Sequence, residues 1–456
     1  MCRIPIIGLL RKDARIRRTA GGIQLQNALA GAYQRKVFVS HSANDDPFAV
    51  AVRDKLAARL EENGYLALVD SAKLKPGQDW NNELYDWLGI CHAAVILVTG
   101  KALASFWVRR ETNILLWRRA RNKGFVVIPA LLAISEGEVA ATGLTELAPV
   151  QAARCDGTGE ADRDAVVEAI MERFPETLPE VAGDPLCRWL QRIARNLHTI
   201  QLYERDVLQE AGRHLDLPAD LAVEWAHEDA CRLIAAQMIG AGLPDRRLEL
   251  ALSAVVRSMD IGPFAKLRSE SLPAWVEAEA ARLVLPERRD TEPDRKTVYL
   301  DVNSEEIAVD YIARAMCREV SDYDHVTVKA LPVGEHPEQE ILQSCRAAVR
   351  TMLVLDDDDP LTPDVVRPRG KVHYLVLHPG LAPPAAVATA AATLRQECRW
   401  LVMVVLSGGG RMTPAILASA GIADVVLVEP RLAPDDEIQA RQLRRAVARL
   451  TAENFG

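Results

Sequence analysis

Short apolar runs alternate with stretches of helical periodicity from Lys36 to about residue 175. The runs KVFVS, YLALVD, AAVILVT and GFVVIPALLAI predict four buried strands, because each is rich in β-branched or aliphatic residues. The segment DPFAVAVRDKLAARLEENG repeats apolar residues at helical spacing and stops at Gly64, and DAVVEAIMERF predicts a closing helix. Such alternation is typical of a parallel sheet covered by helices on both faces.

Helical periodicity with almost no strand signal follows over 184–285 and predicts a small helical bundle. The polar stretch PERRDTEPDRK, 286–296, holds two prolines and indicates a linker. Strand and helix patterns then alternate again from TVYLDVN through RTMLVLDDDD and WLVMVVLSGGG to a last helix, DEIQARQLRRAVARL. A second doubly wound α/β domain is therefore expected at 297–456.

Composition adds limits on the class of protein. A chain of 456 residues with 49% hydrophobic and 26% charged residues suits two or three globular domains. A net charge of -8 argues against a nucleic-acid surface covering the whole protein. The basic N-terminal arm, 1–34, is a solvated arm or a partner-binding segment. No apolar run reaches the length of a membrane span, so a cytoplasmic protein without membrane contact is expected.

Eight cysteines lie far apart in the sequence, without a C-x-x-C pair or a matching histidine cluster. We therefore expect buried reduced thiols, and no metal site. His227, Glu228 and Asp229 are consecutive, so they point to different faces of a helix and are expected in solvated or capping roles.

The stretch GQDWNNELYDWLGICHAAVILVT places one carboxylate, Glu83, near the start of an apolar helix. Spacing alone favours a solvated first-turn residue, stabilised there by the helix dipole. Trp80 either stacks on a ligand ring or anchors the helix start.

Three polar residues, Ser40, His41 and Ser42, close the first predicted strand. Ligands of such folds bind at this carboxyl edge of the sheet, so these side chains are candidate contacts to ribose or phosphate. A capping role for His41 stays open.

Residues 36 to about 175 resemble a Toll/interleukin-1 receptor (TIR) domain. VFVSHSANDD resembles the opening strand and polar turn of that family, and YLALVDSAKLKPGQDW resembles its second strand and mobile loop, which here contains Lys75. The segment from Glu83 onward is similar to the plant immune-receptor version and ends in Ser105, Trp107 and Glu111. The resemblance implies a flavodoxin-like parallel-sheet domain at 35–180. Trp107 and Glu111 lie one turn of helix apart, so we expect them to have structural roles and to anchor the start of their helix.

In the NAD-hydrolysing members of this family the glutamate at the position of Glu83 is catalytic. The resemblance therefore implies an NAD+ nucleosidase of the bacterial effector type, with NAD+ as substrate and no further cofactor. Ser40, His41, Ser42, Lys75 and Trp80 are the implied NAD+ contacts, although Lys75 is equally well read as a solvated loop residue. One carboxylate suffices in principle, because the nicotinamide ring of NAD+ is already positively charged. It leaves without protonation by a general acid.

The family also implies activation by self-association into a homo-oligomer, driven by an unknown trigger that acts through the C-terminal domains. The expected role is anti-phage defence or regulated cell suicide. Two alternatives remain open at this point. One is a non-enzymatic TIR adaptor, and the other is the TIR subunit of a short-Argonaute system, whose C-terminal region should be rich in antiparallel strands.

The second α/β region has a weaker similarity to the first. Laying EILQSCRAAVRTMLVLD over ELYDWLGICHAAVILVT places Glu340 on Glu83 and aligns the following apolar runs. This suggests a diverged TIR-like repeat that serves as a sensor or assembly domain and does not catalyse.

Overall fold

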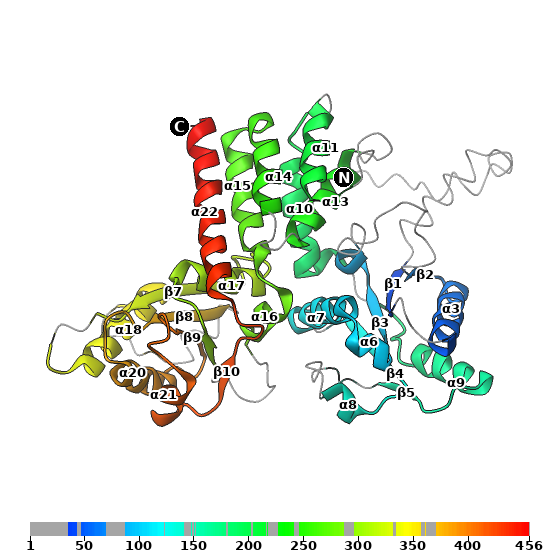
Figure 1. Cartoon of the computed structure of the whole chain (residues 1–456), viewed down its shortest axis with the longest axis horizontal. Coiled ribbons are helices and arrows are strands. Elements are labelled where there is room, and N and C mark those ends of the chain that lie inside the picture. Colours follow the sequence, from blue (N-terminus) through cyan, green and yellow to red (C-terminus); the bar gives the residue numbers. More distant parts are fainter. Residues whose placement is uncertain are drawn as a thin grey trace. The chain divides into compact units, whose positions relative to one another are not determined.

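The structure, a computed structural model, describes residues 35–42, 47–69, 87–122, 124–140, 147, 150, 152–178, 181–201, 204–215, 217, 227–240, 246–286, 296–331, 334–356, 361 and 371–455. The chain divides into two compact units. The first comprises Met1–Lys73, Ile90–Arg109 and Phe125–Pro179, and the second comprises Leu74–Gly89, Arg110–Gly124 and Glu180–Gly456. Each unit holds one β-sheet (Figure 1). The predicted domain boundaries stay predictions, and the basic arm and most of the linker lie outside the described residues.

The sheet of the first unit has five parallel strands in the order β2-β1-β3-β4-β5. They are β1 (Arg35–Ser40), β2 (Tyr65–Val69), β3 (Ala93–Val98), β4 (Val126–Leu132) and β5 (Ala153–Cys155). All six residues of β3 are buried, as expected for a central strand covered on both faces. The four predicted strands are confirmed. β5 was not predicted, because three residues are too few to form a readable hydrophobic pattern.

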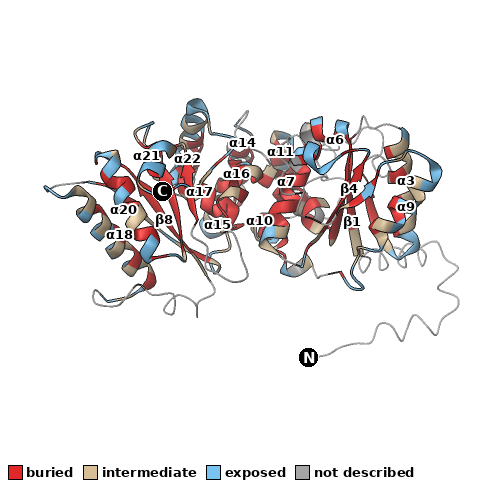
Figure 2. Cartoon of the chain, turned by 90° about the horizontal axis from the view of Figure 1, so that it is seen from below, coloured by how far each residue is buried: buried red, intermediate tan, exposed pale blue. Residues whose placement is uncertain are grey.

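Helices lie between and after these strands along the chain. They are α3 (Pro47–Glu62), α6 (Gly100–Ala104), α7 (Phe106–Arg121), α8 (Glu136–Ala140) and α9 (Glu160–Met171). α3 buries Ala49, Val52, Leu56 and Leu60, which recur at helical spacing. It ends as predicted before Gly64, whose φ of +81° is accessible to glycine at little cost. Figure 2 shows the buried strands between helices whose outer faces are exposed.

The second unit begins with the predicted helical segments. These are η3 (Val181–Gly183), α10 (Pro185–Leu197), α11 (Arg205–His214), α13 (His227–Gly240), α14 (Arg247–Val255), η6 (Val256–Ser258), α15 (Ile261–Ser271), η7 (Leu272–Trp275) and α16 (Ala278–Leu283). α10 packs against α13 and α15, and α11 packs against α14. Asp184 caps the N-terminus of α10. Its carboxylate accepts hydrogen bonds from the amides of Leu186 and Cys187, at 3.0 and 3.4 Å.

A second parallel sheet follows, in the order β10-β6-β9-β8-β7. Its strands are β6 (Thr297–Leu300), β7 (Tyr323–Lys329), β8 (Val372–His378), β9 (Leu401–Leu406) and β10 (Val425–Leu427). Its helices are α17 (Glu305–Ala315), α18 (Pro337–Leu353), α20 (Pro384–Glu397), α21 (Pro414–Ser419) and α22 (Pro434–Phe455). α18, α20 and α21 lie together on one face of the sheet, and α17 and α22 lie on the other (Figure 1). The expected doubly wound α/β region is confirmed.

The suggestion of a TIR-like repeat is not supported by this sheet. The first strand of the N-terminal sheet, β1, lies between the second and third strands, whereas its counterpart β6 lies between the fifth and fourth. The apolar run after Glu340 is also not the predicted strand, because residues 350–353 continue α18. Its buried residues Ile341, Cys345, Val349 and Leu353 recur every four positions, so one helical face extends through the run.

The last part of α7 belongs to the second unit and is packed into its interior. The Trp117 indole NH donates to the carbonyl of Ala315 at 2.9 Å. Its ring meets that of Trp189 edge to face, with centroids 6.4 Å apart. The Arg314 guanidinium lies 5.1 Å from the centroid of each ring, within the range of cation–π attraction. α7 therefore carries residues of both compact units on one helix.

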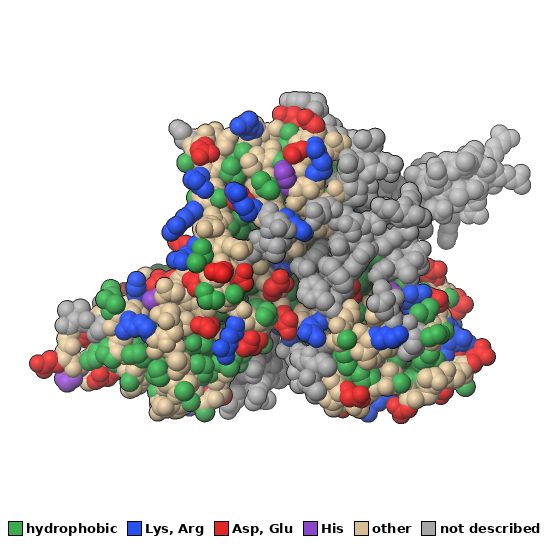
Figure 3. Space-filling model, viewed as in Figure 1, with side chains coloured by type: hydrophobic (Ala, Val, Ile, Leu, Met, Phe, Trp, Pro, Cys, Tyr) green, Lys and Arg blue, Asp and Glu red, His purple; other side chains and the backbone are tan. Residues whose placement is uncertain are grey.

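On the face drawn in Figure 3, acidic and basic side chains of the described residues are interspersed. The seven described cysteines are reduced and buried, which confirms that prediction for them. Within the described ranges, no helix combines the length and the apolar character needed to span a bilayer.

Candidate functional site

The carboxyl edge of the first sheet carries three buried polar side chains. Ser40 is the last residue of β1, and His41 and Ser42 follow it directly. Their exposed fractions are 1%, 7% and 5%. The sequence places them here because KVFVS forms a strand that lies between two parallel neighbours and ends at the polar residues. Buried hydroxyl and imidazole groups at a strand end are suited to hold a polar ligand in a fixed position.

His41 is held by an arginine on α3. Arg53 Nη1 lies 3.0 Å from His41 Nε2. A guanidinium has no acceptor, so Nε2 must accept this hydrogen bond and the neutral His41 ring carries its proton on Nδ1. Asp54 in turn fixes Arg53, since its Oδ1 lies 2.8 Å from Nε and 2.7 Å from Nη2.

Arg53 was missed by the sequence reasoning. Its side chain is 13% exposed and places a permanent positive charge beside the end of β1, where the negative charges of a phosphate group would be favoured. No local motif predicts this role, because Arg53 is one of many charged residues on an amphipathic helix.

The strand order explains why this edge is the expected binding place. The chain leaves β1 toward β2 on one side and returns to β3 on the other, so β1 and β3 flank the point where the connections diverge. Crevices at such points are the usual ligand sites of open parallel sheets. On the β3 side the next residue is Thr99, which is 4% exposed. Its hydroxyl accepts from the amide of Ala102 at 3.0 Å and begins α6.

Three of the predicted site residues, Lys75, Trp80 and Glu83, lie outside the described residues. The structure brings Ser40, His41 and Ser42 together and adds Arg53 and Thr99 to the same edge. The role assigned to Glu83 thus stays a prediction. Glu111, assigned to structure, is 5% exposed within α7.

A second group of chemically active side chains lies in the second unit. His227, expected to be solvated or capping, is instead 8% exposed, which shows that the solvated role was wrong. Its Nε2 is 3.9 Å from the sulfur of Cys231, and its ring centroid is 4.8 Å from that of His198. The prediction failed because His198 precedes His227 by 29 residues and comes close only through helix packing. The local signal was the four-residue spacing of His227 and Cys231 on one helix.

Comparison with known proteins bears on the first of these two groups. A comparison with curated proteins finds no match to the chain. The family model described as TIR domain matches residues 37–170, a range that begins within β1 and includes the other four strands of the first sheet and the polar residues at its carboxyl edge. A TIR domain is therefore found at residues 37–170 of this chain.

Proposed function

We propose that the TIR domain hydrolyses the bond between nicotinamide and ribose in NAD+, with Glu83 as the catalytic carboxylate. TIR domains in general support NAD cleavage or adaptor roles. The observation that favours an enzyme here is the buried polar group Ser40, His41 and Ser42, joined by Arg53 at the carboxyl edge of the sheet. A purely adaptor surface has no need for buried polar side chains at this edge.

The chemistry needs few groups. As the bond to nicotinamide breaks, positive charge develops on the ribose, and the Glu83 carboxylate stabilises that oxocarbenium-like state. Nicotinamide leaves as a neutral molecule and takes the bonding electrons. Water then adds to the ribose carbon, giving ADP-ribose and one proton to solvent. In this proposal Trp80 stacks on a ring of the substrate, and Lys75 and Arg53 contact its phosphates.

Self-association gates the activity in this proposal. The second unit relays a trigger, and assembled TIR domains complete one another's sites. α7 offers a physical connection, because residues from both compact units lie on this one helix. Shifting most of the protein from an inactive to an assembled state requires about 5 kcal/mol of differential binding by the trigger. The cellular role that follows is depletion of NAD+ as an anti-phage or cell-suicide response.

The test is NAD+ consumption by the purified full chain at low and high protein concentration, with and without a crowding agent. The wild type should consume NAD+ more steeply as its concentration rises, and Glu83→Gln should not consume it. Glu172→Gln is the matched control, because it makes the same chemical change at an exposed residue just after α9. Equal NAD+ loss in wild type and Glu83→Gln would refute the catalytic assignment.

The adaptor alternative predicts a different outcome. An adaptor would consume no NAD+ under any condition, and Glu83→Gln would leave its binding to other TIR domains intact. Measuring NAD+ in cells that express each variant separates an adaptor from an enzyme that lacks its trigger in vitro. The short-Argonaute alternative loses support, because all strand pairs in the described part of the C-terminal region are parallel.

A further inference from the structure

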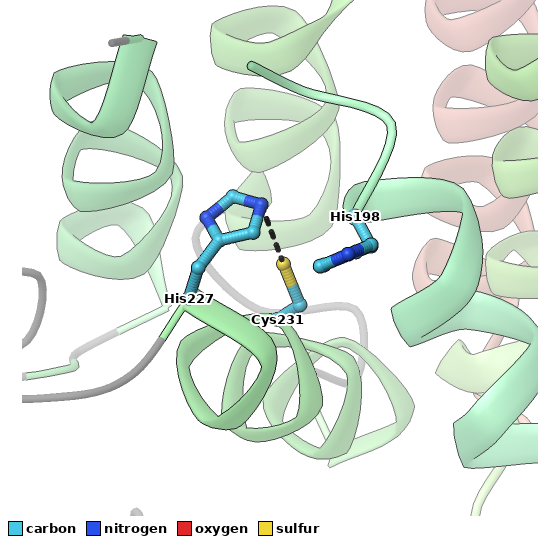
Figure 4. Close-up of side chains that lie close together, drawn as sticks. All are labelled: His198, His227 and Cys231. Atoms are coloured by element: carbon cyan, nitrogen blue, oxygen red, sulfur yellow. Dashed lines mark hydrogen bonds between the residues drawn. The ribbon is translucent and has the colours of Figure 1, made fainter. Parts of the chain in front are cut away.

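Three nitrogen and sulfur side chains converge between the end of α10 and the start of α13 (Figure 4). His198 is the residue directly after α10, where it forms the C-cap. His227 and Cys231 lie four residues apart on α13, so they share one face of that helix. α10 and α13 pack directly against each other, which brings His198 to the other two side chains.

The spacing of the donor atoms is close to that of a metal site. One ligand atom from each of the three residues lies within 4.8 Å of the other two, and His227 Nε2 is 3.9 Å from Cys231 Sγ. In a tetrahedral zinc site with Zn–N near 2.0–2.1 Å and Zn–S near 2.3 Å, two donors are about 3.3–3.6 Å apart. The donor atoms are therefore only slightly farther apart than in a zinc site. His198 is exposed, so its side chain can rotate and bring its nitrogen closer to the other two donors.

The surroundings supply room and charge. His198 and Cys231 line a groove of about 370 Å³ between the two helices, together with Glu228. Arg195 and Arg232 also line this groove and would repel a bare dication. A thiolate from Cys231 and the carboxylate of Glu228 would together cancel the double positive charge of the ion. The repulsion from the two arginines is then largely removed.

The donor set identifies the class of ion. Imidazole nitrogen and thiolate sulfur suit zinc and other late transition metals, whereas magnesium and calcium prefer oxygen ligands. We propose that His198, His227 and Cys231 bind a zinc ion, with Glu228 or water as the fourth ligand. The ion displaces the thiol proton of Cys231 to solvent on binding. It then clamps the end of α10 to the start of α13.

This inference concerns the helical segments of the second unit and is independent of NAD+ cleavage. No metal site is evident from the sequence, because the three residues do not form a motif of closely spaced ligands along the chain. Helix packing supplies the third ligand that chain spacing conceals.

The test uses tag-free full-length protein stripped of metal with a chelator and then titrated with Zn²⁺ or Co²⁺. The wild type should bind one equivalent at this site, and the Co²⁺ form should show thiolate-to-cobalt charge-transfer absorption. His198→Ala removes an exposed ligand with little risk to folding and should weaken binding at least about tenfold. Cys231→Ser should abolish the charge-transfer absorption.

Two matched controls separate ligand loss from general damage. His214→Ala removes a histidine on α11 that contacts Glu210, and Cys187→Ser removes a buried thiol on α10 that contacts Gln191. Both should bind Zn²⁺ like the wild type. Zn²⁺ should also raise the thermal midpoint of the wild type but not of His198→Ala. Absence of the charge-transfer absorption in the wild type, or unchanged Zn²⁺ affinity in His198→Ala, would overturn the proposal.

Discussion

Replacing Asp184 by asparagine tests how strongly the interior of the second unit depends on one buried ion pair. The side chains of Arg118 and Asp184 are each 1% exposed, and Arg118 Nη2 lies 3.1 Å from Asp184 Oδ2. Arg118 also donates to the carbonyl of Leu88, so the Leu88 carbonyl remains its partner when the carboxylate is lost. Asparagine keeps the size of the side chain and an oxygen that can cap α10. The substitution removes the negative charge and replaces the oxygen that faces Arg118 and Asn122 by an amide group that can only donate.

The expected cost follows from burial. Breaking a buried ion pair by removing one partner destabilises a protein by about 3–5 kcal/mol, because the remaining charge loses a counter-charge in the interior. Asp184→Ala should cost about 1 kcal/mol more, because the cap of α10 is lost as well. Such a loss is a large fraction of the ~5–15 kcal/mol by which a typical domain is stable.

Urea unfolding of the full chain, followed by fluorescence and by hydrogen exchange of the α10 amides, measures this cost. The midpoint for the second unit should fall by roughly 1–2 M. The control is Glu397→Gln on α20, which breaks the pair with Arg346, whose side chain is 32% exposed. A partly exposed pair of this kind contributes about 0–1 kcal/mol. The reasoning is refuted if Asp184→Asn destabilises no more than Glu397→Gln.

Three further predictions address the site and the cores. Arg53→Gln removes the guanidinium that donates to His41, together with its positive charge. It should lower kcat/KM for NAD+ about tenfold with little change in thermal midpoint, which steady-state kinetics and circular dichroism can check. An unchanged rate would count against a role for Arg53. Burial raises the pKa of Asp310 above its ordinary value of 3.8, so its contribution to stability is full below that pH and is lost as pH rises. The unfolding free energy of the wild type should therefore fall relative to Asp310→Asn between pH 4 and 7, and a constant difference in urea titrations would contradict this. Leu56→Ala, at a fully buried position of α3, should cost about 2–5 kcal/mol in the same assay, and a loss below about 1 kcal/mol would show that the site collapses around the cavity.

Local patterns along the chain were sufficient for most of the elements. The run AAVILVT indicated β3 because a strand buried on both faces needs an unbroken apolar sequence, and Gly64 indicated the end of α3 because glycine accepts a positive φ. The polar edge formed by Ser40, His41 and Ser42 was also predictable, since the end of a strand and the edge of a parallel sheet are the same place. The family of residues 37–170 was likewise readable from ordered motifs.

Only the tertiary structure decided which distant residues meet. It placed Arg53 against His41, set the order of the second sheet, and extended α18 through a run that resembles a strand. It also brought His198 to His227 and Cys231 through the packing of α10 on α13. Periodicity reports how each side chain is placed relative to its own helix or strand. Contacts between elements depend instead on how complete apolar faces fit together, and that information is spread over the whole chain.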